Sequence, residues 1–463
     1  MKELNRRNFL KRSISSVVSS SPLLAMLGSL DKLEAADTSG DYKAIVCVLL
    51  EGGADVFNMI APRQQDAYDD YRAIRGSMAL ERASLLPFTH SNQNNKNPLA
   101  YGMRSNMGQM QQLFENKKLA IMANVGTLIE PVTLYDITHG APLPSQLFAH
   151  NTQRALWMMG DGKNVHNNGW AARAGDIFYP TPNPYFNVMV GGNNIMQLGG
   201  IAEAIAFDDA YVSPDTMQYY GFGPQSGGGE LGGVYQGIYN SKQSDNNKLL
   251  AAFAKQRIEK LNQQVTLSNA GLFDGVQDFA GFTTGVHETG VSLGKQLELV
   301  AQILSVRNNF PGHRKRQIFF VNHHGWDTHD SDNEQQVGYL SDSLGAFQDA
   351  LEKGSMGLAS QVTTFTISDF GRSLSSNGVG TDHGWGSHAF VMGGAVKGGD
   401  IYGKMPQLSS SSPDGLGDSM IPSMAMEEYL ATIVKWFGAN QNELNSIFPN
   451  LSAFETSDIG FMS

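Results

Sequence analysis

Cysteine is almost absent from this chain. Cys47 is the single cysteine among 463 residues, so no disulfide can form within the molecule. It lies in the apolar run AIVCVLL, where a thiol is more often a small buried hydrophobe than a reactive group. The sequence therefore excludes a disulfide scaffold and offers no reactive thiol.

Basic residues are also scarce relative to acidic ones. The chain has 33 Lys and Arg against 44 Asp and Glu, which gives a formal net charge of −11. A protein of this charge repels phosphate backbones and anionic lipid surfaces. We therefore expect no nucleic-acid partner.

A long uninterrupted apolar run is missing as well. The most apolar terminal stretch, Ile14 to Leu30, is broken by Pro22 and several serines, which argues against a stable membrane span. The twin-arginine pattern NRRNFLK at residues 5–11 precedes it. We predict that residues 1–36 are an export signal read by the twin-arginine machinery, which implies a periplasmic, cell-surface or secreted protein. The alternative is a cytoplasmic amphipathic helix.

The rest of the chain predicts one large α/β domain over residues 37–463. Residues 43–50 form a continuous apolar strand, as in a parallel strand buried on both faces. Further strands alternate with helices, among them an amphipathic helix expected at 248–267, and this order implies a mainly parallel sheet flanked by helices on both faces. A loop-rich insertion is expected near 207–245. Its Tyr and Gly content is the only support for a sugar- or polymer-binding module.

Two sets of polar residues follow predicted strands. Asp55 comes after the first strand and a Gly52-Gly53 turn, where it is either a metal ligand or a turn cap. Asp327 and His329 stand two apart in GWDTH, after a strand ending at Val321. On an extended segment, side chains two apart point the same way and can share one cation. A hydrogen-bonded Asp/His turn is the alternative.

A third set lies in the stretch from Thr363 to Gly394. Asp369 stands at a strand end and is followed by a glycine-rich loop, and the remaining candidates are Asp382, His383 and His388. Arg372 is a candidate to clamp an oxyanion, with an ion pair to Asp369 as the equal alternative. Because these strand ends are expected at one sheet edge, they predict a metal site. Its ligands would be Asp55, Asp327, His329, Asp369 and one or more of Asp382, His383 and His388.

The twin-arginine start is followed by a series of motifs, in the order LLEGGADVFNMIAP, PSQLFAHNTQ, GWAARAGD, GWDTH, SDFGRS, TDHGWGSHAFVMGGAVKGGDIYG and FPNL. In this set, which spans nearly all of the chain after the signal, the chain resembles a family of secreted bacterial proteins, the domain of unknown function 1501. That family is similar to the alkaline phosphatase and sulfatase superfamily. The resemblance implies an alkaline phosphatase-like fold, one or two metal ions (zinc being the expected one) and hydrolysis of phosphate or sulfate esters.

Asp55 matches the superfamily's first acid, and Asp327 with His329 resembles its Asp/His pair, although with a shorter spacing. The strand end TISDFG resembles the superfamily pattern T-x-D-H-G, but Phe370 stands where a histidine ligand is expected. His383 is the candidate to replace it from the loop, and His388 is the candidate last histidine. This departure leaves the number of metals open.

Ser145 is the best-placed hydroxyl for a nucleophile, with a helix N-cap as its other role. The chain has no C-x-P-x-R motif, which excludes a formylglycine sulfatase. The sequence therefore predicts an exported metal-dependent hydrolase acting on a small-molecule or polymer ester, with Arg372 or an imidazole stabilising the oxyanion. The alternative is a non-catalytic surface or assembly protein that keeps a degenerate site.

Overall fold

A computed structural model describes residues 42–91, 97, 99–202, 204–207, 237, 239–251, 254–255, 292–310, 315–352 and 356–463. The predicted export signal, most of the expected insertion near 207–245 and most of the helix expected at 248–267 lie outside these residues. Within the described part of the chain, every helix is too short or too polar to span a lipid bilayer.

A nine-stranded sheet forms the centre of the molecule, in the order β13-β5-β12-β9-β1-β8-β6-β7, with β16 joined to β5. β12 runs antiparallel to both of its neighbours, and the other pairs are parallel. The prediction of a mainly parallel α/β sheet is therefore confirmed. The strands are β1 (Lys43–Leu50), β5 (Leu119–Gly126), β6 (Asn187–Met189), β7 (Ile205–Ala206), β8 (Arg316–His323), β9 (Val362–Ser368), β12 (Ser387–Met392), β13 (Ile401–Tyr402) and β16 (Met424–Ala425).

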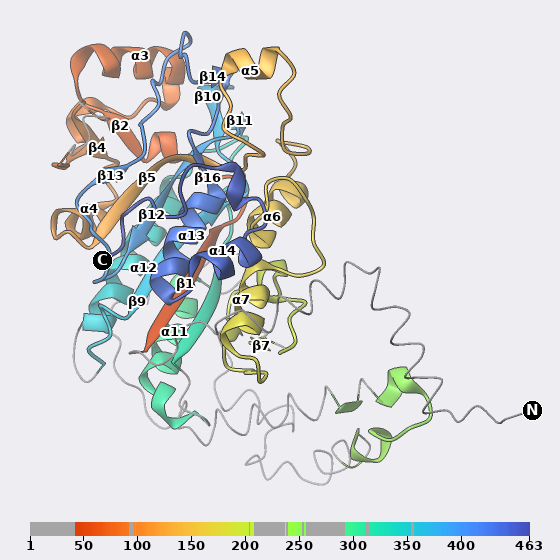
Figure 1. Ribbon diagram of the computed structural model, residues 1–463. Helices are drawn as coiled ribbons and strands as arrows, with labels where there is room; N and C mark the ends of the chain where they lie inside the picture. The colour runs from red at the N-terminus through yellow and green to blue at the C-terminus, as the bar shows by residue number, and fades with distance from the viewer. Residues whose placement is uncertain are drawn as a thin grey trace, which may run out of the picture.

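Helices cover both faces of this sheet (Figure 1). One hydrophobic core joins the sheet to α4 (Gly108–Glu115), α11 (Leu293–Ser305) and α12 (Glu334–Glu352), and the other joins it to α6 (His150–Met159), α7 (Trp170–Phe178), α13 (Met426–Phe437) and α14 (Gln441–Ile447). The position of β1 between these two cores explains why its sequence is apolar throughout. Val46 and Val48 face the first core, whereas Ile45 and Cys47 face the second. Cys47 is buried, and this burial raises the pKa of its thiol well above the usual value.

Smaller elements lie outside this sheet, and their strands form three separate small sheets. They are β2 (Ile60–Pro62), β3 (Leu86–Pro87), β4 (Tyr101–Met103), β10 (Arg372–Ser376), β11 (Thr381–His383), β14 (Gly415–Leu416), β15 (Ser419–Met420), α3 (Gln65–Arg75) and α5 (Leu134–Thr138), with short 3₁₀ turns at Val56–Asn58, Gly76–Met78, Arg82–Ser84, Ile195–Gln197, Arg307–Asn309 and Leu451–Ala453. β10 and β11 form a hairpin directly after β9, which returns the glycine-rich loop to the end of the central strands.

The central strands end side by side. Leu50 of β1 is in register with His323 of β8 and with Ser368 of β9. The segments that carry Asp327 and Asp369 therefore leave the sheet at one edge, as expected for parallel strands.

The helix expected to follow Ser145 directly begins later in the chain. α6 starts at His150, with Ala149 as its N-cap. Gln146 has a φ of +49°, a left-handed conformation that interrupts a right-handed helix, and the Gln153 side chain donates to the carbonyl oxygens of Ser145 and Gln146. Ser145 is thus an exposed turn residue, not the helix N-cap.

Candidate metal centre

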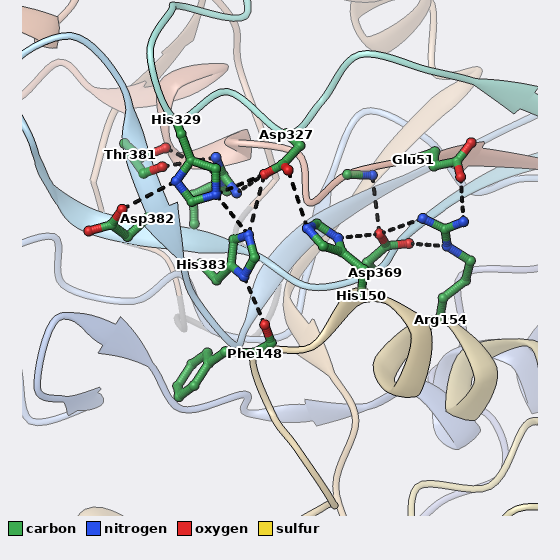
Figure 2. Close-up of polar contacts among 12 residues, drawn as sticks. Glu51, Phe148, His150, Arg154, Asp327, His329, Asp369, Thr381, Asp382 and His383 are labelled. Carbon is green, nitrogen blue, oxygen red and sulfur yellow. Dashed lines mark hydrogen bonds and ion pairs between the residues drawn. The ribbon is translucent and has the colours of Figure 1, made fainter.

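Three side chains from separate elements converge at the edge where the central strands end (Figure 2). His150 opens α6, Asp327 follows β8 and His383 ends β11. One ligand atom from each of the three lies within 4.8 Å of the others. Nε2 of His383 is 3.3 Å from Oδ1 of Asp327, and Nε2 of His150 is 3.4 Å from Oδ2. We call these three residues the ligand cluster.

His329 lies against the solvent side of the ligand cluster. Its Nε2 is 3.0 Å from Oδ1 of Asp327 and 2.9 Å from Nε2 of His383. Its side chain is 44% exposed, and that of its neighbour Asp382 is 71% exposed. His329 is therefore the most exposed of the three histidines, since the side chains of His150 and His383 are 30% and 21% exposed.

The hydrogen bonds of the three imidazoles assign their tautomers. Each Nδ1 faces an oxygen that can only accept: His150 faces Asp369 at 2.8 Å, His383 faces the Phe148 carbonyl at 2.8 Å, and His329 faces Asp382 at 3.3 Å. Each Nδ1 must then carry the proton, which leaves a lone pair on each Nε2. The Nε2 lone pairs of His150 and His383 thus face the Asp327 carboxylate, and a shared cation satisfies all three. Outer oxygen acceptors that orient histidine ligands are a regular feature of metal sites.

Asp369 holds His150 and does not itself join the ligand cluster. Its carboxylate is completely buried and accepts from Nε and Nη2 of Arg154, at 2.9 and 3.0 Å, and from the Gly52 backbone at 3.2 Å. The hydrogen bond to Asp369 raises the pKa of His150. The structure therefore places this predicted ligand one step behind a histidine.

Arg154, which pairs with Asp369, also binds a second acid. This acid is Glu51, which accepts from Nδ1 of His324 at 2.5 Å and from the Asn322 amide at 2.6 Å. The hydrogen bond from His324 is the main reason that the pKa of Glu51 falls to about 2. His150 and Arg154 escaped the sequence analysis, although their spacing of four in FAHNTQR puts both on one face of a helix.

Arg372 meets a different acid from the one expected. It is fully buried and donates from Nη1 to Asp327 at 3.0 Å, from Nε to the Thr381 hydroxyl at 3.2 Å and from Nη2 to the Thr381 carbonyl at 2.9 Å. The expected alternative, an ion pair with Asp369, is wrong because Arg154 occupies that carboxylate. Burial acts to raise the pKa of Asp327, but the hydrogen bond and charge of Arg372 lower it overall.

Two predicted ligands point elsewhere. Asp55 is buried and pairs with Arg75 of α3, with Oδ1 2.5 Å from Nη2. His388 accepts from the Asn124 backbone through Nδ1 at 3.0 Å and packs edge-on against Phe57. Burial lowers the pKa of His388 to about 3, so the ring is neutral. The structure does not bring either residue to the ligand cluster.

Phe370 fills the place where a histidine ligand is expected. Its ring lies 4.7 Å from that of His150 and 4.5 Å from that of His383, measured between ring centroids. It packs against both imidazoles and supplies no ligand atom. Burial lowers the pKa of His383, which favours the neutral ring that a metal requires.

Comparison with known proteins identifies a family for part of the chain. Residues 311–444 match the family described as "Protein of unknown function (DUF1501)", so the expected resemblance is confirmed over those residues. They contain Asp327, His329 and His383. A search of curated proteins finds no relative.

Several solved structures are weakly similar to this one. Ps i-CgsB is 10% identical over 90% of this chain and 78% of its own, with a TM-score of 0.35. The C-terminal periplasmic domain of EcEptC from Escherichia coli, solved in complex with Zn, is 8% identical over 91% and 90%, with a TM-score of 0.32. A protein in the alkaline phosphatase superfamily from Vibrio parahaemolyticus is 13% identical over 88% and 69%, with a TM-score of 0.33.

Proposed function

We propose that this chain, which matches DUF1501 over residues 311–444, is an exported metal-dependent hydrolase of phosphate or sulfate esters. The observation that carries the proposal is the set of inward-facing lone pairs on His150 and His383 around the Asp327 carboxylate. Imidazole and carboxylate ligands suit zinc, and three protein ligands with an open position are typical of catalytic zinc. The export route is the twin-arginine machinery that the N-terminal pattern predicts.

The chemistry divides between the cation and His329. A bound divalent cation would polarise the ester and make water more acidic. Nε2 of His329 takes a proton from the attacking water, and Asp382 holds the tautomer through Nδ1. The water oxygen forms a bond to phosphorus or sulfur while the bond to the leaving oxygen breaks, and His329 passes its proton to that oxygen.

Water is the proposed nucleophile, in place of Ser145. Among the described residues, no side-chain hydroxyl is hydrogen-bonded to His150, Asp327, His329 or His383. Ser145 contributes only its carbonyl oxygen to Gln153. Arg372 is then a positioning residue that fixes Asp327 and does not serve as an oxyanion clamp.

Metal analysis and hydrolysis assays test the proposal on the folded, exported protein. We expect about one equivalent of zinc and turnover of an aryl phosphate, phosphodiester or sulfate. The Asp327→Ala/His383→Ala double variant should lose both, whereas His139→Ala, which alters an exposed histidine of α5's C-cap, should lose neither. His329→Gln should keep the metal and lose most of the turnover. A protein with neither metal nor turnover after metals are added back contradicts the proposal.

A non-catalytic surface or assembly role is the second candidate. It is favoured by the contact of His329 with two members of the ligand cluster, because a fourth ligand would close the site as in structural zinc centres. In that case His329→Gln would weaken metal binding strongly, and the metal-loaded protein would hydrolyse none of the esters.

A further inference from the structure

We infer that this site selects esters carrying a single negative charge, namely a phosphodiester or a sulfate ester, over dianionic phosphate monoesters, and that Phe148 and Val379 contact the apolar group of the substrate. The inference rests on the proposed hydrolase function and names its substrate class.

Charge around the ligand cluster is the first argument. Four carboxylates lie in or beside it, and two guanidinium groups pair with three of them: the acids are Asp327, Asp369, Asp382 and Glu51, and the guanidinium groups are those of Arg154 and Arg372. A divalent cation would bring the formal charge of this group to zero. A dianionic monoester would then be drawn by the cation alone and would lie beside acids that have no spare positive charge. A monoanion meets less of this repulsion.

The arginines are the second argument. A dianionic phosphoryl group is usually held by a guanidinium offering two parallel N–H groups. Arg372 is fully buried, with its Nε, Nη1 and Nη2 all donating to Asp327 or Thr381. Arg154 directs its Nε and Nη2 to Asp369 and its Nη1 to Glu51. In the described part of the chain, neither arginine that contacts this group presents an unpaired fork.

Two exposed apolar side chains belong to segments that hold the cluster histidines. The Phe148 carbonyl accepts from His383 (Figure 2), and Phe148 is 45% exposed. Val379 is 61% exposed on the β10–β11 hairpin, where the neighbouring Asn377 amide donates to the His329 carbonyl at 2.8 Å. An apolar group on the substrate that reached either side chain would gain by burying it.

A series of 4-nitrophenyl esters that differ in charge tests the first half of the inference. The metal-loaded protein is assayed with 4-nitrophenyl phosphate, methyl 4-nitrophenyl phosphate, phenyl 4-nitrophenyl phosphate and 4-nitrophenyl sulfate. We expect kcat/KM for a diester or the sulfate to exceed that for the monoester by about tenfold or more, and the two arms distinguish phosphorus from sulfur substrates. Binding of phenylphosphonate and of its monomethyl ester, measured by calorimetry at mildly alkaline pH, gives a readout independent of turnover. The monoanion should bind more tightly.

Variants of the two apolar residues test the second half. Phe148→Ala and Val379→Ala should raise KM for the phenyl diester about three- to tenfold and leave the methyl diester unchanged. Val165→Ala is the matched control, since Val165 is 68% exposed and lies in the segment between α6 and α7. Val379→Lys should improve the monoester relative to the diesters.

The results separate the two levels of proposal. Faster turnover of the monoester together with tighter binding of the dianionic phosphonate overturns the charge preference and leaves the hydrolase function intact. Equal KM values for the phenyl diester in all variants overturn the role of Phe148 and Val379. If no ester is turned over, the hydrolase function fails, and the calorimetric comparison still decides the charge preference.

Discussion

At the residue scale, two acids that follow strands, Asp55 and Asp369, each form an ion pair with an arginine. Asp369 pairs with Arg154, and Asp55 pairs with Arg75, whose side chain is completely buried. A charge removed from water is costly unless it is paired, so each arginine offsets the cost of burying its acid. Asp369, whose oxygens accept from Arg154, His150 and Gly52, supports the metal centre from behind, whereas Asp55 faces Arg75.

We predict that Asp55→Asn destabilises the protein without removing metal. Arg75 would remain buried without its counter-charge, which costs roughly 3–5 kcal/mol of unfolding free energy. Urea unfolding and metal analysis measure the two effects, with the exposed Asp66→Asn of α3 as the control. The Asp55→Asn/Arg75→Met double variant should recover part of the stability. Loss of metal at unchanged stability would show instead that Asp55 is a ligand.

At the element scale, the turn after β1 sets the position of Phe370. Gly53 has a φ of +83°, and a Cβ built there would lie 2.6 Å from the Phe370 ring. That ring in turn packs against His150 and His383. The turn therefore needs glycine both for its backbone and for the space beside it.

We predict that Gly53→Ala weakens metal binding about tenfold, in the range seen for residues that orient metal ligands. The added methyl group displaces Phe370 and thereby tilts both histidines. Gly76→Ala separates this contact from backbone strain, because Gly76 has a φ of +55° but open space around its Cβ. Gly76→Ala should cost about 1–2 kcal/mol of stability and leave metal affinity unchanged, as measured by titration against a chelator. Equal metal affinities in the two variants would show that the position of Phe370 does not affect metal binding.

The N-terminus of α13 holds a buried acid that makes stability depend on pH. Glu427 is fully buried, and its Oε1 accepts from the Gly162 backbone at 2.7 Å. Burial, with a smaller contribution from Asp161, raises the pKa of Glu427 from 4.5 to about 7. Between these values the folded protein holds a proton that the unfolded chain releases, so stability falls as pH rises through this window.

We predict that Glu427→Gln flattens this pH dependence. In the natural protein the contribution of Glu427 declines by about 3 kcal/mol between pH 4.5 and about 7, and an amide cannot release the proton. Urea midpoints measured across this range test the prediction, with the exposed Glu334→Gln of α12 as the control. A variant whose midpoint varies with pH as strongly as that of the natural protein would contradict it.

At the scale of the whole molecule, the metal centre ties together elements that are distant in sequence. His150 and Asp369 are 219 positions apart, and His383 and Asp327 are 56 apart. A cation held by α6, the segment after β8 and the β10–β11 hairpin would bind only the folded arrangement. Metal binding must then stabilise the entire fold by mass action.

We predict that a chelator lowers the melting temperature of the loaded protein by several degrees. Free metal at about a hundred times its Kd contributes about 2.7 kcal/mol of stability. The Asp327→Ala/His383→Ala variant should melt at the same temperature with and without chelator. An unchanged melting temperature of the natural protein, despite measured loss of its metal, would place the cation outside the folded core.

The sequence by itself determined the sheet and part of the site. The apolar run of β1 could only be a strand buried on both faces, because its alternate residues enter two cores. The GWDTH motif and the TDH triplet also marked Asp327, His329 and His383, and the structure brings these three together. The sequence could indicate these features because they depend on local periodicity and on strand ends.

Only the tertiary structure decided the partners. In the folded protein Asp55 pairs with Arg75, Asp369 with Arg154 and Asp327 with Arg372. His388 is buried in the core. The spacing of charges along a chain does not say which ones meet, because each buried charge pairs with whichever opposite charge the packing brings within reach. For the same reason the sequence did not predict His150 as a site residue. It reaches the site because α6 begins beside the ends of three strands.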